Sequence, residues 1–369
     1  MRRDLLLLIA GVVLGWGCPT DTLGATPAQL GSVLRRAQQF RDIEVSEQDE
    51  LRLGEAVSEK VRARYGVVQD AAVHKYVSLV GTVLALASSR PNLTYHFIVL
   101  DTDGVNAFAA PGGYVHITRG ALALMKSENE LGCVLAHELI HVTEKHTIRA
   151  IQKGKLVQMG ADETLAGNAA LFSKVVDMAT EVVMAGFGRA EELEADEKGL
   201  VLANRVGYAP QGLGSFLNTL ADRNKSATQK QGLFASHPEM QERLDKITKQ
   251  ISAQKLTASV TLEARYRGSI SYEPAPQTAI AQVESGSAGL AGGSETKKTE
   301  DQPKKKGFGL SGLIKPGGDE KKSAEVTGSG GSRGVDTERN AKGGSVPTLV
   351  AVTLTPAEVA AFKKEGKLS

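Results

Sequence analysis

The sequence predicts an α+β fold, a mainly helical domain with a small β-sheet beside one central helix. Apolar residues recur at helical spacing over several long segments within 46–251. Two short runs rich in β-forming residues, 94–100 and 114–118, lie on either side of the Gly112-Gly113 turn signal. The 369-residue chain is 41% hydrophobic and 23% charged, as is typical of globular proteins, so one sizeable core with extensions is expected.

Each helix is expected from its periodicity and its end signals. Ser46 and Asp70 suit the starts of helices over 46–64 and 70–87. The apolar segment 169–187 contains three charged residues, which indicates a helix packed in the domain and not a membrane span. Further helices are expected at 131–151, 188–199, 212–222 and 239–251, and a short strand or trailing arm at 260–270.

The strongest functional signal is the pentapeptide H-E-x-x-H at residues 137–141. On a helix, His137 and His141 lie one turn apart on the same face, which is the spacing of two imidazole ligands to one zinc ion. Glu138 lies about 100° round the helix from His137, where its carboxylate can act as a general base. The motif therefore predicts a zinc hydrolase, and most simply a peptidase.

Catalytic zinc usually has three protein ligands and a fourth position for water, so a third ligand is required. The acidic segment 188–199 is expected to be helical, and its Glu192 and Asp196 share one face, one turn apart. One carboxylate could bind the metal while the other accepts the free N–H of a ligand histidine. Spacing alone does not select Glu192 over the neighbouring carboxylates, which an ordinary solvated helix would also carry.

Four segments, in order, resemble the zinc metallopeptidase family that includes the CAAX prenyl protease, the heat-shock protease HtpX and the periplasmic protease BepA. Residues 106–115 are similar to the family pattern N-A-F-A-x-P-G-G-x-V, and residues 137–146 to H-E-x-x-H-V-x-x-x-H. Residues 189–196 are similar to R-x-x-E-x-x-A-D, and residues 237–243 to H-P-x-x-x-x-R. The resemblance covers about residues 44–251 and implies a zincin-like metallopeptidase domain.

The resemblance implies a role for each residue of the predicted centre. His137, His141 and Glu192 would bind one Zn²⁺ per chain. Glu138 would take a proton from the attacking water and pass it to the leaving amine. Asp196 would orient a ligand histidine.

Roles are also expected for four other residues, His237, Arg243, His146 and Cys133. By resemblance, His237 and Arg243 would be catalytic donors to the carbonyl oxygen in the transition state. In some periplasmic relatives the matching histidine instead caps the zinc as a fourth ligand, and the sequence leaves both roles open for His237. His146 is expected to be a solvated cation near a helix end, and Cys133 a small buried residue.

The segment around the glycine turn is expected to bind the substrate. An edge strand beside the metal can hold an extended peptide by main-chain hydrogen bonds. Asn106, Gly113, Tyr114 and Val115 are the expected contacts. This mode of binding gives low sequence selectivity, which suits the cleavage of unfolded proteins. A plain hairpin in a small sheet is the structural alternative, and both can be true.

The first 25 residues are typical of a signal peptide, with Arg2-Arg3 before an apolar run at 5–14. Cys18 allows the alternative of a lipoprotein signal that ends before it, although Gly15-Trp16 fits that pattern poorly. No other segment resembles a membrane span. The bacterial periplasm is therefore the expected location, with anchoring to the outer membrane through an N-terminal lipid as the alternative.

Composition predicts the remaining boundaries. Residues 26–270 are expected to form the metallopeptidase domain. Residues 271–345 are rich in Gly, Ser and Lys and poor in large apolar residues, so they are expected to be a disordered linker. Order is expected to resume at 346–369, with a strand at 348–352 and a helix from Thr355-Pro356 that docks on the core or on a partner.

Taken together, these signals predict a zinc metalloendopeptidase that cleaves misfolded or mislocalised cell-envelope proteins in protein quality control. The alternative is a chaperone-like or scaffold module with latent protease activity, capped by His237. The expected partners are unfolded or misfolded proteins and, as one option, the outer-membrane assembly machinery. A net charge of +2 gives no reason to expect nucleic-acid binding, and two cysteines cannot form a disulfide framework.

Overall fold

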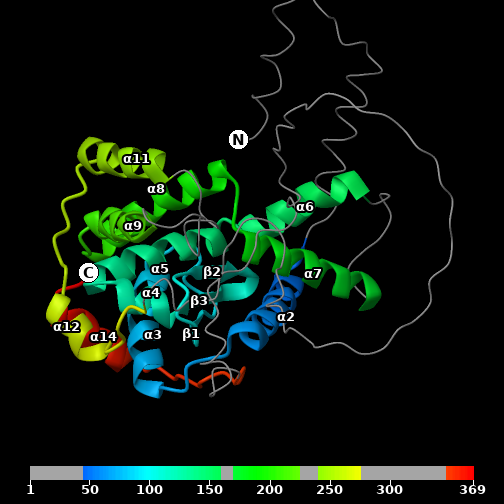
Figure 1. Cartoon of the computed structure of the whole chain (residues 1–369), viewed down its shortest axis with the longest axis horizontal. Helices are drawn as coiled ribbons and strands as arrows, with labels where there is room; N and C mark the ends of the chain where they lie inside the picture. The colour runs from blue at the N-terminus through cyan, green and yellow to red at the C-terminus, as the bar shows by residue number, and fades with distance from the viewer. Residues whose placement is uncertain (1–44, 159–168, 225–239, 276–345) are drawn as a thin grey trace, which may run out of the picture. The chain divides into compact units, whose positions relative to one another are not determined.

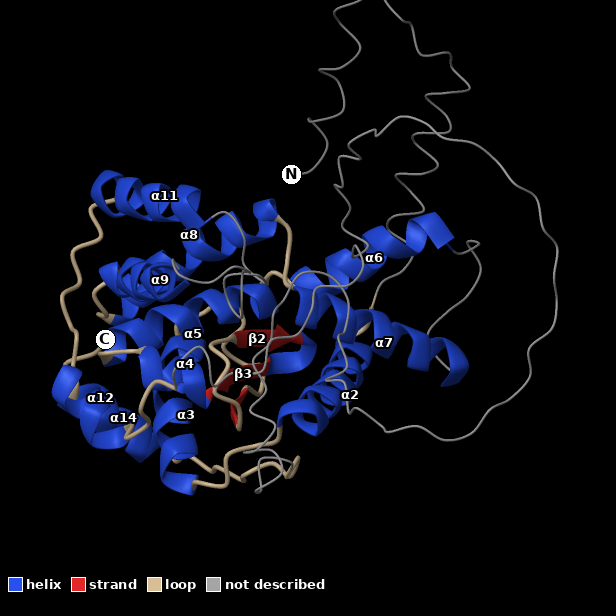
Figure 2. Cartoon of the chain, viewed as in Figure 1, coloured by secondary structure: helices blue, strands red, loops and turns tan. Residues whose placement is uncertain are grey.

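The structure, a computed structural model, describes residues 45–158, 169–224, 240–275 and 346–369 (Figure 1). Its helices are α2 (Glu47–Tyr65), α3 (Ala71–Leu86), α4 (Arg119–Leu124), α5 (Glu128–Thr143), α6 (His146–Gln158), α7 (Ala169–Ala185), α8 (Arg189–Val206), α9 (Gln211–Asn224), α11 (Met240–Ala253), α12 (Glu263–Ser269) and α14 (Pro356–Glu365). Its strands are β1 (His96–Leu100), β2 (Ala107–Ala110) and β3 (Tyr114–Thr118), with the 3₁₀ turn η1 (Pro111–Gly113) before β3. A mainly helical domain with one small sheet confirms the predicted α+β class (Figure 2).

The three strands form one sheet in the order β1-β3-β2. The central strand β3 pairs in parallel with β1, with His96 opposite Tyr114. It pairs antiparallel with β2, with Ala107 opposite Ile117. The described sheet therefore has β2 at one edge, on the side that packs against α5.

Helices cover both faces of the sheet, because successive strand residues point to opposite sides. Val99 and Val115 pack with residues of α3 and α5 in one hydrophobic cluster. Ile98 and Phe108 pack with residues of α2 and α7 in another. Every residue of β2 and β3 is consequently buried, so these strands lack the polar outer face of a half-buried sheet.

Helix α5 is the central element, and all 16 of its residues are buried. Its most extensive contact with another helix is the one with α8. Gly199 of α8 permits the close approach, since a Cβ there would lie 3.1 Å from both Cα and N of His137. This packing sets the acidic first half of α8 against the helix that carries H-E-x-x-H.

The helix predicted over 131–151 is interrupted. Helix α5 ends at Thr143, and α6 begins at His146. Between them Lys145 has a left-handed φ of 55°, and its ammonium lies 2.9 Å from a carboxylate oxygen of Glu50. The break was not predicted because no Gly or Pro marks it and because the contact with Glu50 joins distant parts of the sequence.

Residues 260–270, expected to be a strand or an arm, mostly form helix α12. Only Val260 makes a β-bridge, to Tyr208. Arg265 of α12 donates to Glu128 at the start of α5, at 2.6 Å. A tertiary contact therefore accompanies this helix, and the local sequence does not reveal it.

The C-terminal segment 346–369 docks on the domain. Helix α14 begins at Pro356 as predicted, and Thr355 and Glu358 form a capping box at its start. Phe362 is buried, and the guanidinium carbon of Arg265 lies 3.8 Å from its ring centre. The strand predicted at 348–352 is not formed, and side chains of Arg62 and Gln69 bind the carbonyls of Pro347 and Thr348.

Main-chain hydrogen bonds hold both ends of the C-terminal segment. The N–H of Val67 donates to the carbonyl of Val346, and the N–H of Ser369 donates to the carbonyl of Val206, each at 2.7 Å. These contacts make 346–369 part of the compact unit that extends from residue 45 to the C-terminus.

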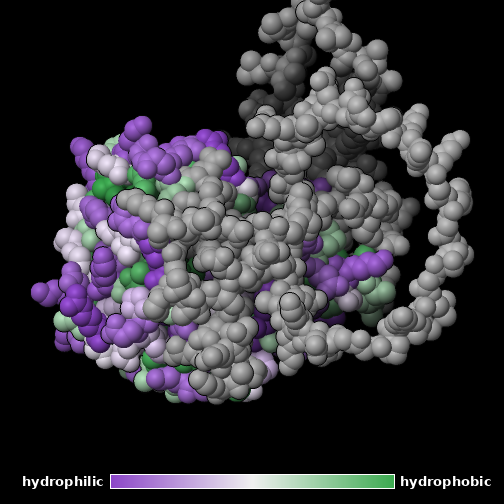
Figure 3. Space-filling view, viewed as in Figure 1, coloured by the Kyte–Doolittle hydropathy of each residue, from purple (hydrophilic) through white to green (hydrophobic). Residues whose placement is uncertain are grey.

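The described helices include none that is both long enough and apolar enough to cross a membrane. The apolar segment 169–187 forms α7 and packs against α2 and the sheet, as predicted. On the face seen in Figure 3, the described surface is mostly hydrophilic, with separate apolar side chains. The predicted signal peptide, and the predicted linker from residue 276 onward, lie outside the described residues.

Candidate metal centre

Helices α5 and α8 bring together the three predicted metal ligands. The Nε2 atoms of His137 and His141, one turn apart on α5, are 3.0 Å apart. Glu192, in the first turn of α8, places one carboxylate oxygen 3.5 Å from Nε2 of His137 and the other 3.6 Å from Nε2 of His141. The three side chains are buried, with at most 4% of each exposed.

The two distances from Glu192 fit a tetrahedral ion, and the 3.0 Å between the histidine nitrogens is somewhat shorter. Bonds of about 2.0–2.2 Å to nitrogen and oxygen, at tetrahedral angles, place the ligand atoms roughly 3.3–3.6 Å apart. Two imidazoles and one carboxylate also form the donor set of catalytic zinc sites that keep a fourth position open. Among the described residues, this is the one group of three His, Cys, Asp or Glu side chains with such an arrangement. The residues present therefore fit Zn²⁺.

An ion-paired carboxylate binds the outer ring nitrogen of His137. Nδ1 of His137 lies 2.9 Å from Oδ1 of Asp196. Arg243 of α11 donates to both oxygens of Asp196, at 2.7 and 2.6 Å. Its Nη1 also lies 3.4 Å from Oε2 of Glu192. Arg243 thus connects a metal ligand to the carboxylate that orients another ligand.

Buried charges shift the pKa values of these side chains. Burial opposes a positive charge on His137, but its contacts with Asp196 and Glu192 raise its pKa to about 9. Burial opposes ionisation of Asp196, but the charge of Arg243 and the hydrogen bonds it receives lower its pKa. Burial also opposes the charge of Arg243, yet the surrounding carboxylates raise its pKa. Asp196 and Arg243 are therefore an ion pair at neutral pH.

Glu138 follows the first ligand on α5 and is 1% exposed. Helical geometry turns its side chain about 100° from that of His137. Its charge contributes to the raised pKa of Arg243, so the carboxylate lies within electrostatic reach of the guanidinium. This buried position agrees with the general-base prediction, which requires a carboxylate at the site.

Different partners surround His141. Its Nδ1 lies 2.7 Å from Nδ1 of His146, whose Nε2 lies 3.2 Å from Oε2 of Glu194. The ring of Phe187 stacks on His141, with centres 4.2 Å apart and planes at 14°. His146 is fully buried, so the expectation of a solvated cation was wrong. Glu194 and Phe187 were not predicted, and only the position of His146 in H-V-x-x-x-H could have pointed to this cluster.

The predicted substrate segment lies in the sheet and in the turn beside it. Tyr114 and Val115 belong to β3, whose main chain pairs with strands on both sides. The edge strands of the described sheet are β1 and β2, so the expectation that 114–115 supplies a peptide-binding edge is not met. Asn106 supports the start of β2, because its Oδ1 accepts from the N–H of Ala107 at 2.9 Å. Gly113, after β2, has a φ of 93° that favours glycine.

Two further predictions concern a cysteine and a histidine near the motifs. Cys133 is buried, as predicted, and its thiol faces the carbonyl of Ala209 at 3.6 Å. Burial raises the pKa of this thiol to about 12, so it stays protonated and unreactive. His237 lies outside the described residues, and its two predicted roles remain proposals.

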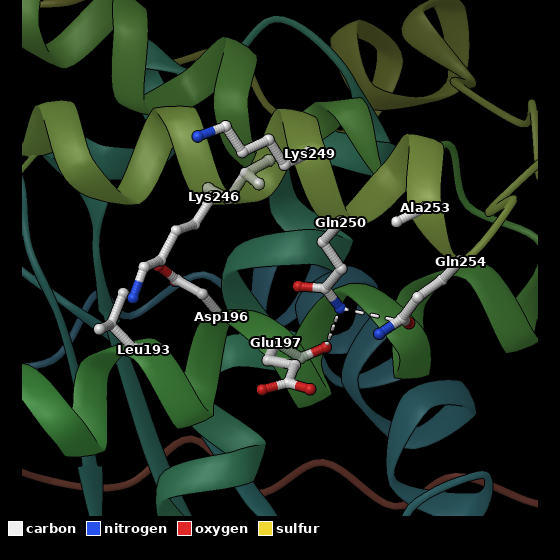
Figure 4. Close-up of a pocket in the computed structure, with 9 residues that line it drawn as sticks. Leu193, Asp196, Glu197, Lys246, Lys249, Gln250, Ala253 and Gln254 are labelled. Carbon is white, nitrogen blue, oxygen red and sulfur yellow. Dashed lines mark hydrogen bonds between the residues drawn. The ribbon is translucent and has the colours of Figure 1, made fainter.

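A surface hollow of about 350 Å³ lies between α8 and α11 (Figure 4). Asp196 contributes to its lining, but none of the three metal ligands does. Across it, the side-chain amide of Gln250 donates to the carbonyl of Glu197 at 2.7 Å. The hollow therefore approaches Asp196 without opening on the ligand triad.

The chain is similar in sequence to known metalloproteases. The sequence profile of peptidase family M48 matches residues 71–251. Over 262 residues the chain is 27% identical to the beta-barrel assembly-enhancing protease of Escherichia coli K12, covering 66% of this chain and 51% of that protein. It is 30% identical over 176 residues to metalloprotease YcaL of Escherichia coli K12, covering 46% and 68%. It is 29% identical over 222 residues to mitochondrial metalloendopeptidase OMA1 of Schizosaccharomyces pombe, covering 57% and 63%.

The chain spans about half the length of the beta-barrel assembly-enhancing protease that it matches. The family match includes the sheet, the ligand-bearing helices α5 and α8, and Arg243 of α11. These findings confirm the resemblance seen in the four sequence segments. The chain belongs to peptidase family M48.

Proposed function

We propose that the protein is a zinc-dependent endopeptidase. The observation that carries this proposal is the buried triad of His137, His141 and Glu192, with the carboxylate of Glu138 on the same helix. Membership of family M48 supports it, as do matched relatives that are named as metalloproteases.

Each residue of the centre has a task in peptide hydrolysis. The triad would hold one zinc ion, which would supply polarisation of a peptide carbonyl and a lowered pKa for a water. Glu138 accepts a proton from the attacking water and delivers it to the leaving amine. Asp196 keeps the Nδ1 proton of His137 in place and so directs Nε2 toward the other ligands.

Arg243 and His237 complete the proposed centre. Arg243 contacts two carboxylates, so we assign it first to holding Asp196 and Glu192 in place. Donation to the substrate carbonyl is its alternative role. For His237, both roles implied by the resemblance are retained: donation to the carbonyl oxygen, or capping of the ion.

The proposed substrate is an unfolded polypeptide that lies along β2. This strand is one of the two edges of the described sheet and is the edge that packs against α5. An extended peptide paired with it would be held by main-chain hydrogen bonds, which depend little on side-chain identity. Asn106 and the turn at Gly113 shape this edge at its two ends. Low selectivity of this kind suits misfolded or mislocalised proteins.

We place this activity in protein quality control of the bacterial cell envelope. A relative named beta-barrel assembly-enhancing protease supports this setting, with outer-membrane assembly machinery as a proposed partner. The signal-like N-terminus supports export to the periplasm, and lipid attachment at Cys18 would anchor the protein to the outer membrane.

Degradation of casein by the purified full-length protein tests the proposed activity. Cleavage should require zinc, stop with a chelator and return when zinc is restored. Glu138→Gln should lower the rate by about 10²–10⁴-fold, because the general base is lost, while zinc still binds. Glu59→Gln, an exposed helix position, is the matched control and should keep the full rate. Full-rate hydrolysis by Glu138→Gln would refute the assigned mechanism.

A further inference from the structure

The two ligand histidines are held by different chemical groups. The outer nitrogen of His137 faces the carboxylate of Asp196, whereas that of His141 faces a second imidazole, Nδ1 of His146, at 2.7 Å. A zinc-binding histidine usually gives its second N–H to a carboxylate, a carbonyl or water. The contact between His141 and His146 is therefore unusual for a zinc-binding histidine.

The break between α5 and α6 creates this contact. A continuous helix would place a residue five positions after His141 well away from its face, because five residues turn the helix by about 500°. The left-handed Lys145 lies between the end of α5 and the start of α6, and His146 begins α6 with its ring fully buried against His141. The backbone thus directs this imidazole toward the metal centre.

The positions of the ring protons determine which of the two histidines donates the hydrogen bond. Because Nε2 of His141 faces the other two ligands, the single proton of its neutral ring lies on Nδ1 and is donated to Nδ1 of His146. His146 then carries its own proton on Nε2 and donates it to Glu194 at 3.2 Å. Lys198 and Arg149 hold Glu194, at 2.6 and 3.3 Å. The chain of hydrogen bonds ends at a carboxylate fixed by two cations.

We propose that His146 is a positioning residue of the metal centre, which fixes the ring orientation and the protonated nitrogen of His141, with Glu194 fixing His146 in turn. Stacking of Phe187 on the His141 ring limits the same rotation from the side. The proposal rests on zinc binding by His141, which is part of the proposed function.

Zinc affinity of the full-length protein, measured by competition with a chromophoric chelator, tests this role. His146→Phe keeps a buried ring but accepts no hydrogen bond, so affinity should fall about 10–100-fold. His146→Asn offers an amide oxygen near the Nδ1 position and should recover most of that loss. With Co²⁺ as a spectroscopic probe, the visible absorption should change in the Phe variant and return toward wild type in the Asn variant.

A second pair of variants tests the far end of the hydrogen-bond chain. Glu194→Gln should lower zinc affinity several-fold, because the amide cannot replace the anchored carboxylate. Glu197→Gln is the matched control, since Glu197 is exposed on α8 three residues after Glu194; it should leave affinity unchanged. If His146→Phe does not fold, the zinc affinities of Glu194→Gln and its control still test the positioning role of His146.

Failure of the positioning role and failure of the proposed function give different results. Wild-type zinc affinity and an unchanged Co²⁺ spectrum in His146→Phe, or wild-type affinity in Glu194→Gln, would overturn the positioning role. Thermal unfolding of the metal-free variants distinguishes lost positioning from a damaged fold: we expect the wild-type midpoint in Glu194→Gln. Absence of zinc binding by the wild-type protein would instead overturn the proposed function itself.

Discussion

Buried carboxylates paired with arginine lie at both ends of helix α5, but only the first belongs to α5 itself; those near the other end belong to α8. At the start, Glu128 is fully buried, accepts hydrogen bonds from the hydroxyls of Tyr76 and Tyr208 at 2.8 and 2.7 Å, and binds Arg265. Near the other end, Arg243 binds the carboxylates that face the ligand histidines. At the start of α5, two tyrosines and Arg265 surround the carboxylate of Glu128. Near the other end, carboxylates of α8 face the imidazoles of α5.

The buried charges around Glu128 connect helices of the fold, whereas those around Arg243 face the proposed metal site. Arg265 also donates to the carbonyl of Phe362, so the cluster at Glu128 joins α5, α12 and α14. Burial and the charge of Glu128 raise the pKa values of Tyr76 and Tyr208, which remain protonated donors. At the other end the nitrogens of His137 and His141 and the carboxylate of Glu192 lie close together, where a bound cation would balance the charge. Similar residue types therefore stabilise the fold at one end and surround the proposed metal site at the other.

Arg265→Met should break the structural end and give the largest change in stability. Removing one partner of a buried ion pair leaves Glu128 uncompensated, which costs about 3–5 kcal/mol of unfolding free energy. Urea unfolding measures this loss, and zinc affinity of the folded protein should stay at the wild-type value. Arg267→Met, an exposed position on the same helix, is the control. A loss of zinc affinity in Arg265→Met would show that the two ends are not independent.

Arg243→Met should break the functional end. Asp196 and Glu192 lose the group that holds them, so zinc affinity should fall about 10–100-fold, equivalent to about 1.4–2.7 kcal/mol. Chelator competition measures this change. Lys246→Met, one turn later and exposed, should bind zinc normally. The opposite pattern, a lower turnover number with unchanged zinc affinity, would assign Arg243 to the substrate carbonyl.

A change at a third buried group, His116 of β3, should have the smallest effect on stability. Its ring is buried in the neutral form, so it is a reference for burial without a charge. Its Nε2 lies 2.9 Å from the hydroxyl of Ser58, and burial lowers its pKa to about 3. The unfolded chain binds a proton near pH 6.5 but the folded chain does not, so stability falls as the pH falls below 6.5. The loss is about 1.4 kcal/mol at pH 5.5. Unfolding curves of His116→Gln should lack this part of the pH slope, and an unchanged slope would contradict the assignment.

Local signals in the sequence predicted much of the fold. Asp70 and Thr355 cap α3 and α14 as expected, because capping depends on neighbouring residues alone. Helical spacing also predicted that His137 and His141 would share a face. The choice of Glu192 came from resemblance to a family, since spacing did not distinguish it from adjacent carboxylates.

Features that depend on distant contacts were not predictable in this way. The end of α5 at Lys145 involves Glu50, and the burial of His146 follows from that break. Arg243 was assigned to the substrate, because nothing in its local sequence indicates that two of its nitrogens bind Asp196. Packing between elements, which a local pattern does not encode, decides each of these cases.

The docking of residues 346–369 has a consequence for the covalent integrity of the chain. Residues 276–345 connect two points of one folded unit, so they are an insertion and not a tail. A single cut within them would leave two polypeptides held together by α14, by the Lys75–Glu358 ion pair and by the bonds at Val346 and Ser369. The chain could therefore be cut once between residues 276 and 345 and keep its C-terminal helix. Its mass on a denaturing gel would change, while its native mass would not.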